Sequence, residues 1–155
     1  MHDLLPWFEA TDAAASELAD SFGFTPWHVD GPSERPPVFV DARGGLVSIV
    51  GEAKLLQVAV IVDAGTEERL AARMLDMPAE ELDGAMVADG LCELANILAG
   101  SLKARTTDLV EGAKLGLPVH VRGVVEPPSG ASYVYLTYRW EDRPVAVLLL
   151  ERAPG

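Results

Sequence analysis

The chain has 155 residues, 49% of them hydrophobic and 23% charged, which is typical of a folded globular domain and excludes a disordered chain. This length has room for one ordinary core, so we expect a single domain over residues 1–155. Asp and Glu number 24 against 12 Lys and Arg, giving a formal charge of −12. Nucleic acids and anionic membranes are bound through basic groups, so this charge argues against both as partners.

Targeting and metal-binding signals are weak throughout the sequence. Cys92 is the only cysteine, so no internal disulfide can form and a reducing compartment is expected. The start, residues 1–12, lacks the features of a signal peptide, and the longest apolar run, Val145–Leu150, is too short to span a bilayer. We therefore expect a cytoplasmic protein. His2, His28 and His120 are far apart and far from Cys92, which predicts no metal site and no bound cofactor.

The first half of the chain is expected to contain one helix, a loop, and three strands. Apolar residues recur at helical intervals from Pro6 to Phe22, and the proline suits a first turn. Gly and Pro residues over Asp30–Pro37 predict a loop. The expected strands are Val38–Asp41, Leu46–Gly51 after a Gly44-Gly45 hairpin turn, and Leu55–Val62, which is apolar enough to be buried on both faces.

Two helices and three strands are expected in the second half. A helix over Thr66–Leu75 has Thr66 as a candidate N-cap and ends before Met77-Pro78. A long helix follows over Ala79–Arg105. The last expected strands are Leu117–Arg122, Tyr133–Trp140 and Val145–Glu151. Consecutive strands usually pair as hairpins, so the fold class is an α+β two-layer sandwich, with a mostly antiparallel six-stranded sheet and helices on one face.

The long helix carries a narrow polar stripe. With Asp89 at zero, Glu93 falls at about 40°, Asn96 at about −20° and Gly100 at about 20° around the helix axis. We call these four residues the polar ridge. The opposite side is apolar and should pack on the sheet, so the ridge should face outward. The apolar side consists of Val87, Leu91, Leu94, Leu98 and Leu102.

Two members of the polar ridge are unfavourable inside a helix. Asn96 has low helix propensity, and Gly100 costs about 1 kcal/mol relative to alanine. Bare backbone at Gly100 would let another chain approach Asn96, whose amide can both donate and accept hydrogen bonds and so orient a water molecule. A solvated polar face is the simpler interpretation of any single carboxylate here, but it leaves these two residues unexplained.

The pattern Asp89-x-x-x-Glu93-x-x-Asn96, with Gly100 and Pro118 after it, resembles the signature of the CheC/CheX/FliY phosphatases. The stretch Val87–Gly123 is most similar to the CheX branch, and the resemblance extends over roughly residues 4–151. It implies a phosphatase that hydrolyses the aspartyl phosphate of a CheY-like receiver domain. Asn96 would orient the attacking water, and Glu93 would pair with the active-site lysine of the receiver.

The resemblance also implies the surroundings of that reaction. Asp89, Glu93 and Gly100 would contact the receiver, and the Mg²⁺ would belong to the receiver rather than to this chain. Members of the CheX branch are dimers joined through their sheets, and an open sheet leaves edges that a second copy can cover, so a homodimer is expected.

Other interpretations stay open at this point. The CheC-like members carry a second motif in the first helix, where this chain has Glu9, Asp12 and Ser16. An ionised aspartate cannot donate a hydrogen bond and would repel phosphate, so we expect one site per chain. The alternative function is a non-catalytic receiver-binding or adaptor module, and a weaker one is a structural oligomer of the flagellar-switch type.

Overall fold

The computed structural model describes residues 4–21, 28–106 and 112–152, which form one antiparallel sheet with three α-helices. The strands lie in the order β1-β6-β7-β3-β2-β4, and β5 also pairs with β2. The α+β architecture and the antiparallel pairing are therefore as predicted, with seven strands in place of six. The helices are α1 (Leu5–Ser21), α2 (Ala64–Leu75) and α3 (Gly84–Arg105), with a 3₁₀ turn, η2 (Ala79–Glu81). The strands are β1 (His28–Ser33), β2 (Ala42–Val50), β3 (Leu55–Asp63), β4 (Lys114–Leu115), β5 (Val119–Arg122), β6 (Ser132–Trp140) and β7 (Arg143–Arg152).

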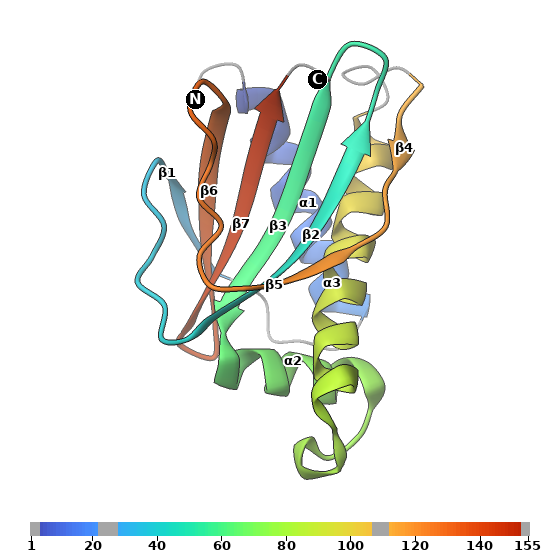
Figure 1. The fold of residues 1–155 in the computed structure, drawn as a ribbon, viewed down its shortest axis with the longest axis vertical. Coiled ribbons are helices and arrows are strands. Elements are labelled where there is room, and N and C mark those ends of the chain that lie inside the picture. Colours follow the sequence, from blue (N-terminus) through green and yellow to red (C-terminus); the bar gives the residue numbers. More distant parts are fainter. Residues whose placement is uncertain (1–3, 22–27, 107–111, 153–155) are drawn as a thin grey trace.

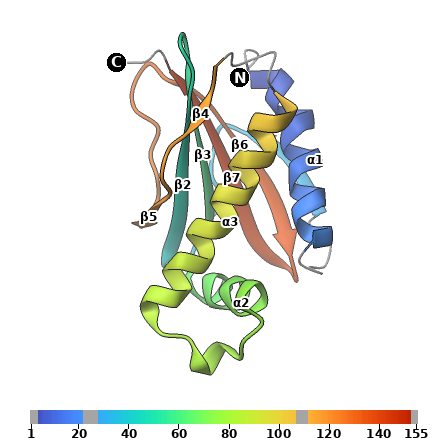
Figure 2. The same ribbon diagram turned by 90° about the vertical axis from the view of Figure 1, so that its right-hand side faces the viewer.

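Helices α1 and α3 lie side by side on one face of the sheet, and α2 lies across one end of it (Figures 1 and 2). The main core fills the space between the sheet and these helices. The central strand β3 is buried along most of its length, as its apolar run indicated. Fully buried side chains of the main core include Leu56, Val58, Leu91, Leu94, Leu98 and Val147.

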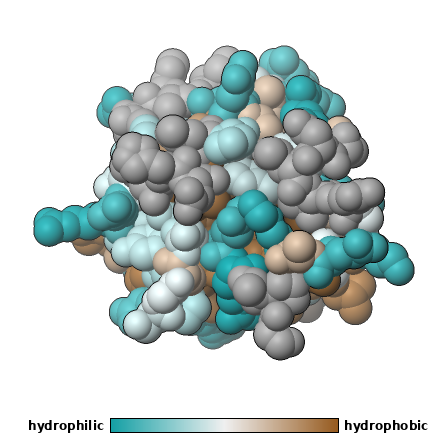
Figure 3. Space-filling model, turned by 90° about the horizontal axis from the view of Figure 1, so that it is seen from above, coloured by the Kyte–Doolittle hydropathy of each residue, from teal (hydrophilic) through white to brown (hydrophobic). Residues whose placement is uncertain are grey.

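The second face of the sheet is covered by connecting segments rather than by helices. A small cluster of Ala59, Ile61, Tyr135 and Leu148 lies there, with Phe39 packed against it. The connection that follows β5 crosses in front of the sheet in Figure 1. Seen from the end that carries the β2–β3 turn, the described surface is mostly hydrophilic, with hydrophobic atoms mainly in the gaps (Figure 3).

The prediction of a hairpin turn at Gly44-Gly45 is wrong. Both glycines lie inside β2, and the expected strand Val38–Asp41 is not a strand. A Cβ at Gly45 would lie 2.9 Å from the carbonyl oxygen of Leu91, so this glycine lets α3 approach the sheet. The turn comes later, where the Gly51 N–H donates to the carbonyl oxygen of Lys54 at 2.9 Å.

The loop predicted over Asp30–Pro37 is partly a strand. Strand β1 includes Gly31 and Pro32 and pairs with β6, with an irregularity between Val29 and Gly31. Because β1 lies at the edge of the sheet, a proline there is tolerated, since its missing N–H breaks no central ladder.

The remaining corrections concern element ends. The N-cap of α2 is Asp63, and Thr66 is buried in the first turn. Helix α3 begins at Gly84 instead of Ala79, and its N-cap Asp83 accepts a hydrogen bond from the Met86 N–H at 2.8 Å. The strand expected over Leu117–Arg122 begins two residues later, as β5, and the short strand β4 that precedes it was not predicted.

Candidate functional site

Two glycines fix the position of α3. Gly45 lets it lie close on β2, and Gly90 lets it cross α2, because a Cβ at Gly90 would lie only 2.7 Å from the Cβ of Ala71. Real Cβ atoms almost never come so close, so a larger residue at either glycine would force the backbone elements apart. The helix that carries the polar ridge is therefore held on two sides by backbone contacts.

The polar ridge lies at the surface of α3. Asp89 and Glu93 are exposed, and Asn96 and Gly100 are half-buried. The opposite side is buried as predicted, with Leu91, Leu94, Leu98 and Leu102 fully covered and Val87 nearly so. By length and hydropathy α3 could cross a membrane, but its apolar side is packed inside this domain.

The two carboxylates of the polar ridge have no partner within the described part of the chain. Neither Asp89 nor Glu93 forms an ion pair or side-chain hydrogen bond there. On a helix, residues three or four positions apart have Cβ atoms about 5–6 Å apart, so Glu93 is a direct neighbour of both Asp89 and Asn96. An acid and an amide thus stand together, available to a molecule outside the chain.

Gly100 is not required by crowding inside the described chain. A Cβ there would lie 3.8 Å from Cδ1 of Leu115 in β4, which is ordinary van der Waals contact. With respect to the described residues an alanine would fit and would favour the helix, so none of them gives a reason for glycine at this position.

Cys92 lies beside the polar ridge as a half-buried thiol. Burial raises the pKa of Cys92, and the carboxylates of Asp89 and Glu67 raise it further. Because the thiolate is the nucleophilic form, this cysteine is poorly suited to nucleophilic chemistry.

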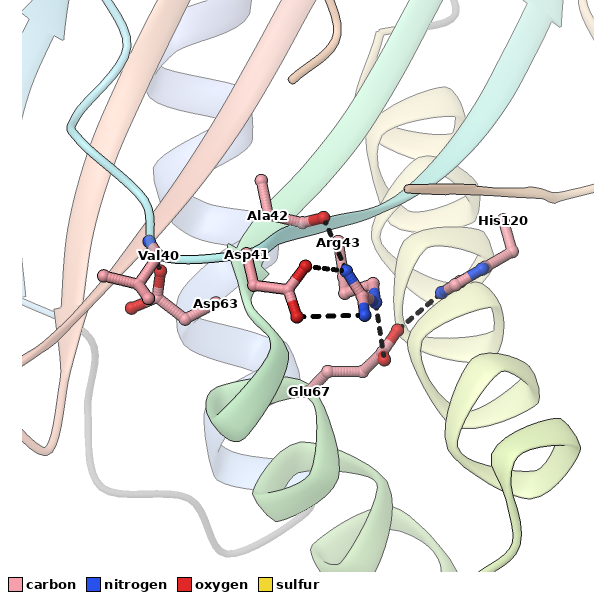
Figure 4. Close-up of polar contacts among 7 residues, drawn as sticks. All are labelled: Val40, Asp41, Ala42, Arg43, Asp63, Glu67 and His120. Atoms are coloured by element: carbon pink, nitrogen blue, oxygen red, sulfur yellow. Dashed lines mark hydrogen bonds and ion pairs between the residues drawn. The ribbon is translucent and has the colours of Figure 1, made fainter. Parts of the chain in front are cut away.

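A network of ionisable groups lies near the start of α3 (Figure 4). The buried carboxylate of Glu67, in the first turn of α2, lies 2.6 Å from Nε2 of His120 in β5 and 4.0 Å from Nε of Arg43 in β2. Arg43 donates to Asp41 at 2.6 Å. We call Asp41, Arg43, Glu67 and His120 the polar network, and it ties β5, β2 and α2 together.

No pattern in the sequence predicts the polar network. Glu67 and His120 are 53 positions apart, and their pairing depends on how α2 and β5 meet. They border a surface cleft of about 590 Å³ that Gly84, Val87 and Ala88 of α3 also line. Within the described ranges, no group of three His, Cys, Asp or Glu residues could hold a metal ion.

One acidic residue of the first helix, Asp12, has a structural role. Asp12 accepts a hydrogen bond from the Tyr138 hydroxyl at 2.6 Å. Burial raises the pKa of Tyr138, and the bond to Asp12 and its charge raise it further. Asp12 is thus engaged with the sheet.

The family model described as chemotaxis phosphatase CheX matches residues 43–133, more than half of the chain and all of α3. The chain belongs to the CheX family. A sequence search of curated proteins found no match.

Solved structures share the CheX fold over nearly the whole chain. The CheX chain of a CheX–CheY–BeF₃–Mg²⁺ complex from Borrelia burgdorferi matches with a TM-score of 0.79 and 17% identity, covering 94% of this chain and 97% of that one. The chemotaxis protein CheX from Vibrio vulnificus matches with a TM-score of 0.79 and 14% identity, covering 95% of this chain and 99% of that one. FliM from a Helicobacter pylori FliM–SpeE complex matches with a TM-score of 0.66 and 9% identity, covering 97% of this chain and 88% of that one. At these identities the likeness shows the fold.

Proposed function

We propose that this protein is a phosphatase that hydrolyses the aspartyl phosphate of a CheY-like receiver domain. The observation that carries the proposal is the pair of exposed Glu93 and half-buried Asn96 at the surface of α3, in a domain of the CheX family. The relative from Borrelia burgdorferi, whose structure is a complex with CheY, BeF₃ and Mg²⁺, supports a receiver as the partner.

Asn96 is the proposed catalytic residue. Its half-buried amide would accept a hydrogen bond from a water molecule and hold the water oxygen in line with phosphorus. A bond then forms between water oxygen and phosphorus, and the bond from phosphorus to the aspartyl oxygen breaks. The electron pair of the broken bond stays on the regenerated carboxylate, and both protons of the attacking water leave with inorganic phosphate.

Glu93 and Asp89 are the proposed docking residues. Glu93 would pair with the active-site lysine of the receiver, and a charge-assisted contact of this kind fixes geometry as well as adding affinity. The absence of an internal partner for Glu93 among the described residues supports this role. Gly100 would leave room for the receiver backbone, and the Mg²⁺ would be part of the receiver substrate.

A homodimer in the cytoplasm is part of the proposal. Strands β1, β4 and β5 lie at the two edges of the sheet, and Leu117 and Val119 beside one edge are exposed by 88% and 55%. Pairing of edges between two copies would cover unpaired strand groups and these side chains. Sedimentation of the purified chain tests this, with a monomer at all concentrations as the contradicting result.

The test of the function is a screen of purified phosphorylated receivers for accelerated phosphate release. We expect at least one receiver to lose phosphate faster with the natural protein and not with Asn96→Ala. Binding without acceleration would contradict the enzyme and favour the non-catalytic adaptor. No binding and no acceleration with any receiver would contradict both.

A further inference from the structure

A groove opens between α2 and α3 directly beside Glu93. Its volume is about 420 Å³. Gly90 and Ala71 form the tight crossing between the two helices, and α2 ends one turn later at Leu75, where Asp76 takes a left-handed conformation with φ 51°. The groove is lined by Met74, Leu75, Asp89, Gly90, Glu93 and Ile97.

The groove combines an apolar wall with an acidic rim. Leu75 is 42% exposed, and Met74 and Ile97 are half-buried. Asp89 and Glu93 supply two carboxylates without an ion-pair partner among the described residues. An occupant that suits both features has an apolar side chain next to a basic group.

We propose that the receiver domain inserts an apolar side chain into this groove while its basic group meets Glu93. This inference rests on the proposed function and adds a second contact to it. The groove shares Asp89 and Glu93 with the polar ridge, so a receiver placed on Asn96 lies next to it. Charge complementarity favours a basic partner over a second copy of this acidic chain.

This contact would help to select the receiver. A lysine opposite Glu93 is a feature that many receivers can offer, whereas a fitting apolar side chain beside it distinguishes one from another. Burial of the exposed 42% of Leu75 corresponds to a roughly three- to eightfold gain in affinity.

The experiment compares Leu75→Ser with Val38→Ser on a receiver that binds the natural protein. Val38 is 92% exposed and belongs to the segment before β2, so its variant removes an exposed apolar side chain away from the groove. Titration calorimetry with the receiver loaded with beryllofluoride and Mg²⁺ gives Kd, and phosphate release gives the maximal rate. Thermal unfolding checks that each variant is folded. Leu75→Met tests whether another apolar side chain at this position keeps the natural Kd.

We expect Leu75→Ser to raise Kd roughly three- to eightfold with the maximal rate kept, and Val38→Ser and Leu75→Met to leave Kd unchanged. An unchanged Kd in Leu75→Ser overturns the groove proposal. The rate of phosphate release by the natural protein tests the phosphatase function independently of that result. A raised Kd without any catalysis by the natural protein keeps the groove and overturns the enzyme. A change in oligomeric state in Leu75→Ser, with Kd unchanged, assigns the groove to a second copy and also overturns the proposal.

Discussion

Substitution of Gly100 by alanine should separate the stability of the fold from docking of the receiver. The added Cβ has 3.8 Å to Cδ1 of Leu115, so nothing inside the described chain opposes it. Alanine favours a helix interior over glycine by about 1 kcal/mol. For a domain of this size, that gain raises Tm by roughly 2–4 °C.

Gly90→Ala is the matched control on the same helix. It brings the same gain in propensity, but its Cβ would lie 2.7 Å from Cβ and 2.9 Å from Cα of Ala71. Overpacking typically costs about 1–3 kcal/mol, so this variant should lose on the order of 1 kcal/mol overall. Urea unfolding of both variants measures the difference, which we expect to be about 2 kcal/mol.

The same Gly100→Ala variant should bind the receiver less tightly. The extra methyl group lies where the receiver backbone is proposed to approach, and about 1 kcal/mol of overpacking corresponds to roughly a fivefold higher Kd. A less stable Gly100→Ala would refute the packing described around Leu115. A more stable variant with an unchanged Kd would refute the role of Gly100 in docking.

Two further predictions concern groups beside the polar ridge. Glu67→Ala should lower the free energy of unfolding by about 1–3 kcal/mol, because it leaves His120 without its partner. Glu68→Ala, at the exposed neighbouring position, should change that free energy by less than about 0.5 kcal/mol. Urea unfolding of the two variants measures the difference. Alkylation of Cys92 at pH 8 should be slower in the folded than in the urea-unfolded protein, because a raised pKa leaves less thiolate at that pH, and equal rates would contradict the shift.

The sequence was sufficient to predict the helix that carries the candidate site. Its apolar residues recur on one side over about four turns, so the outward position of Glu93 and Asn96 followed from helix geometry alone. The apolar run of β3 likewise indicated a central strand. Such features depend on local periodicity, which a single sequence contains.

Features that depend on contacts between distant elements were missed. Gly44-Gly45 has the composition of a turn, and only the approach of Leu91 explains why Gly45 lies in a strand. Strand β1 pairs with β6, more than a hundred residues later, and no local pattern shows this. The bond between Glu67 and His120 and the groove beside Leu75 arise only when the helices and strands pack together.

The central claim is that Asn96 acts on the chemical step and Glu93 on docking. The most direct measurement is the rate of receiver dephosphorylation across receiver concentrations for the natural protein, Asn96→Ala and Glu93→Ala. We predict a maximal rate lower by on the order of 10²–10³ in Asn96→Ala, and a weaker apparent affinity in Glu93→Ala. A natural maximal rate in Asn96→Ala would contradict the account.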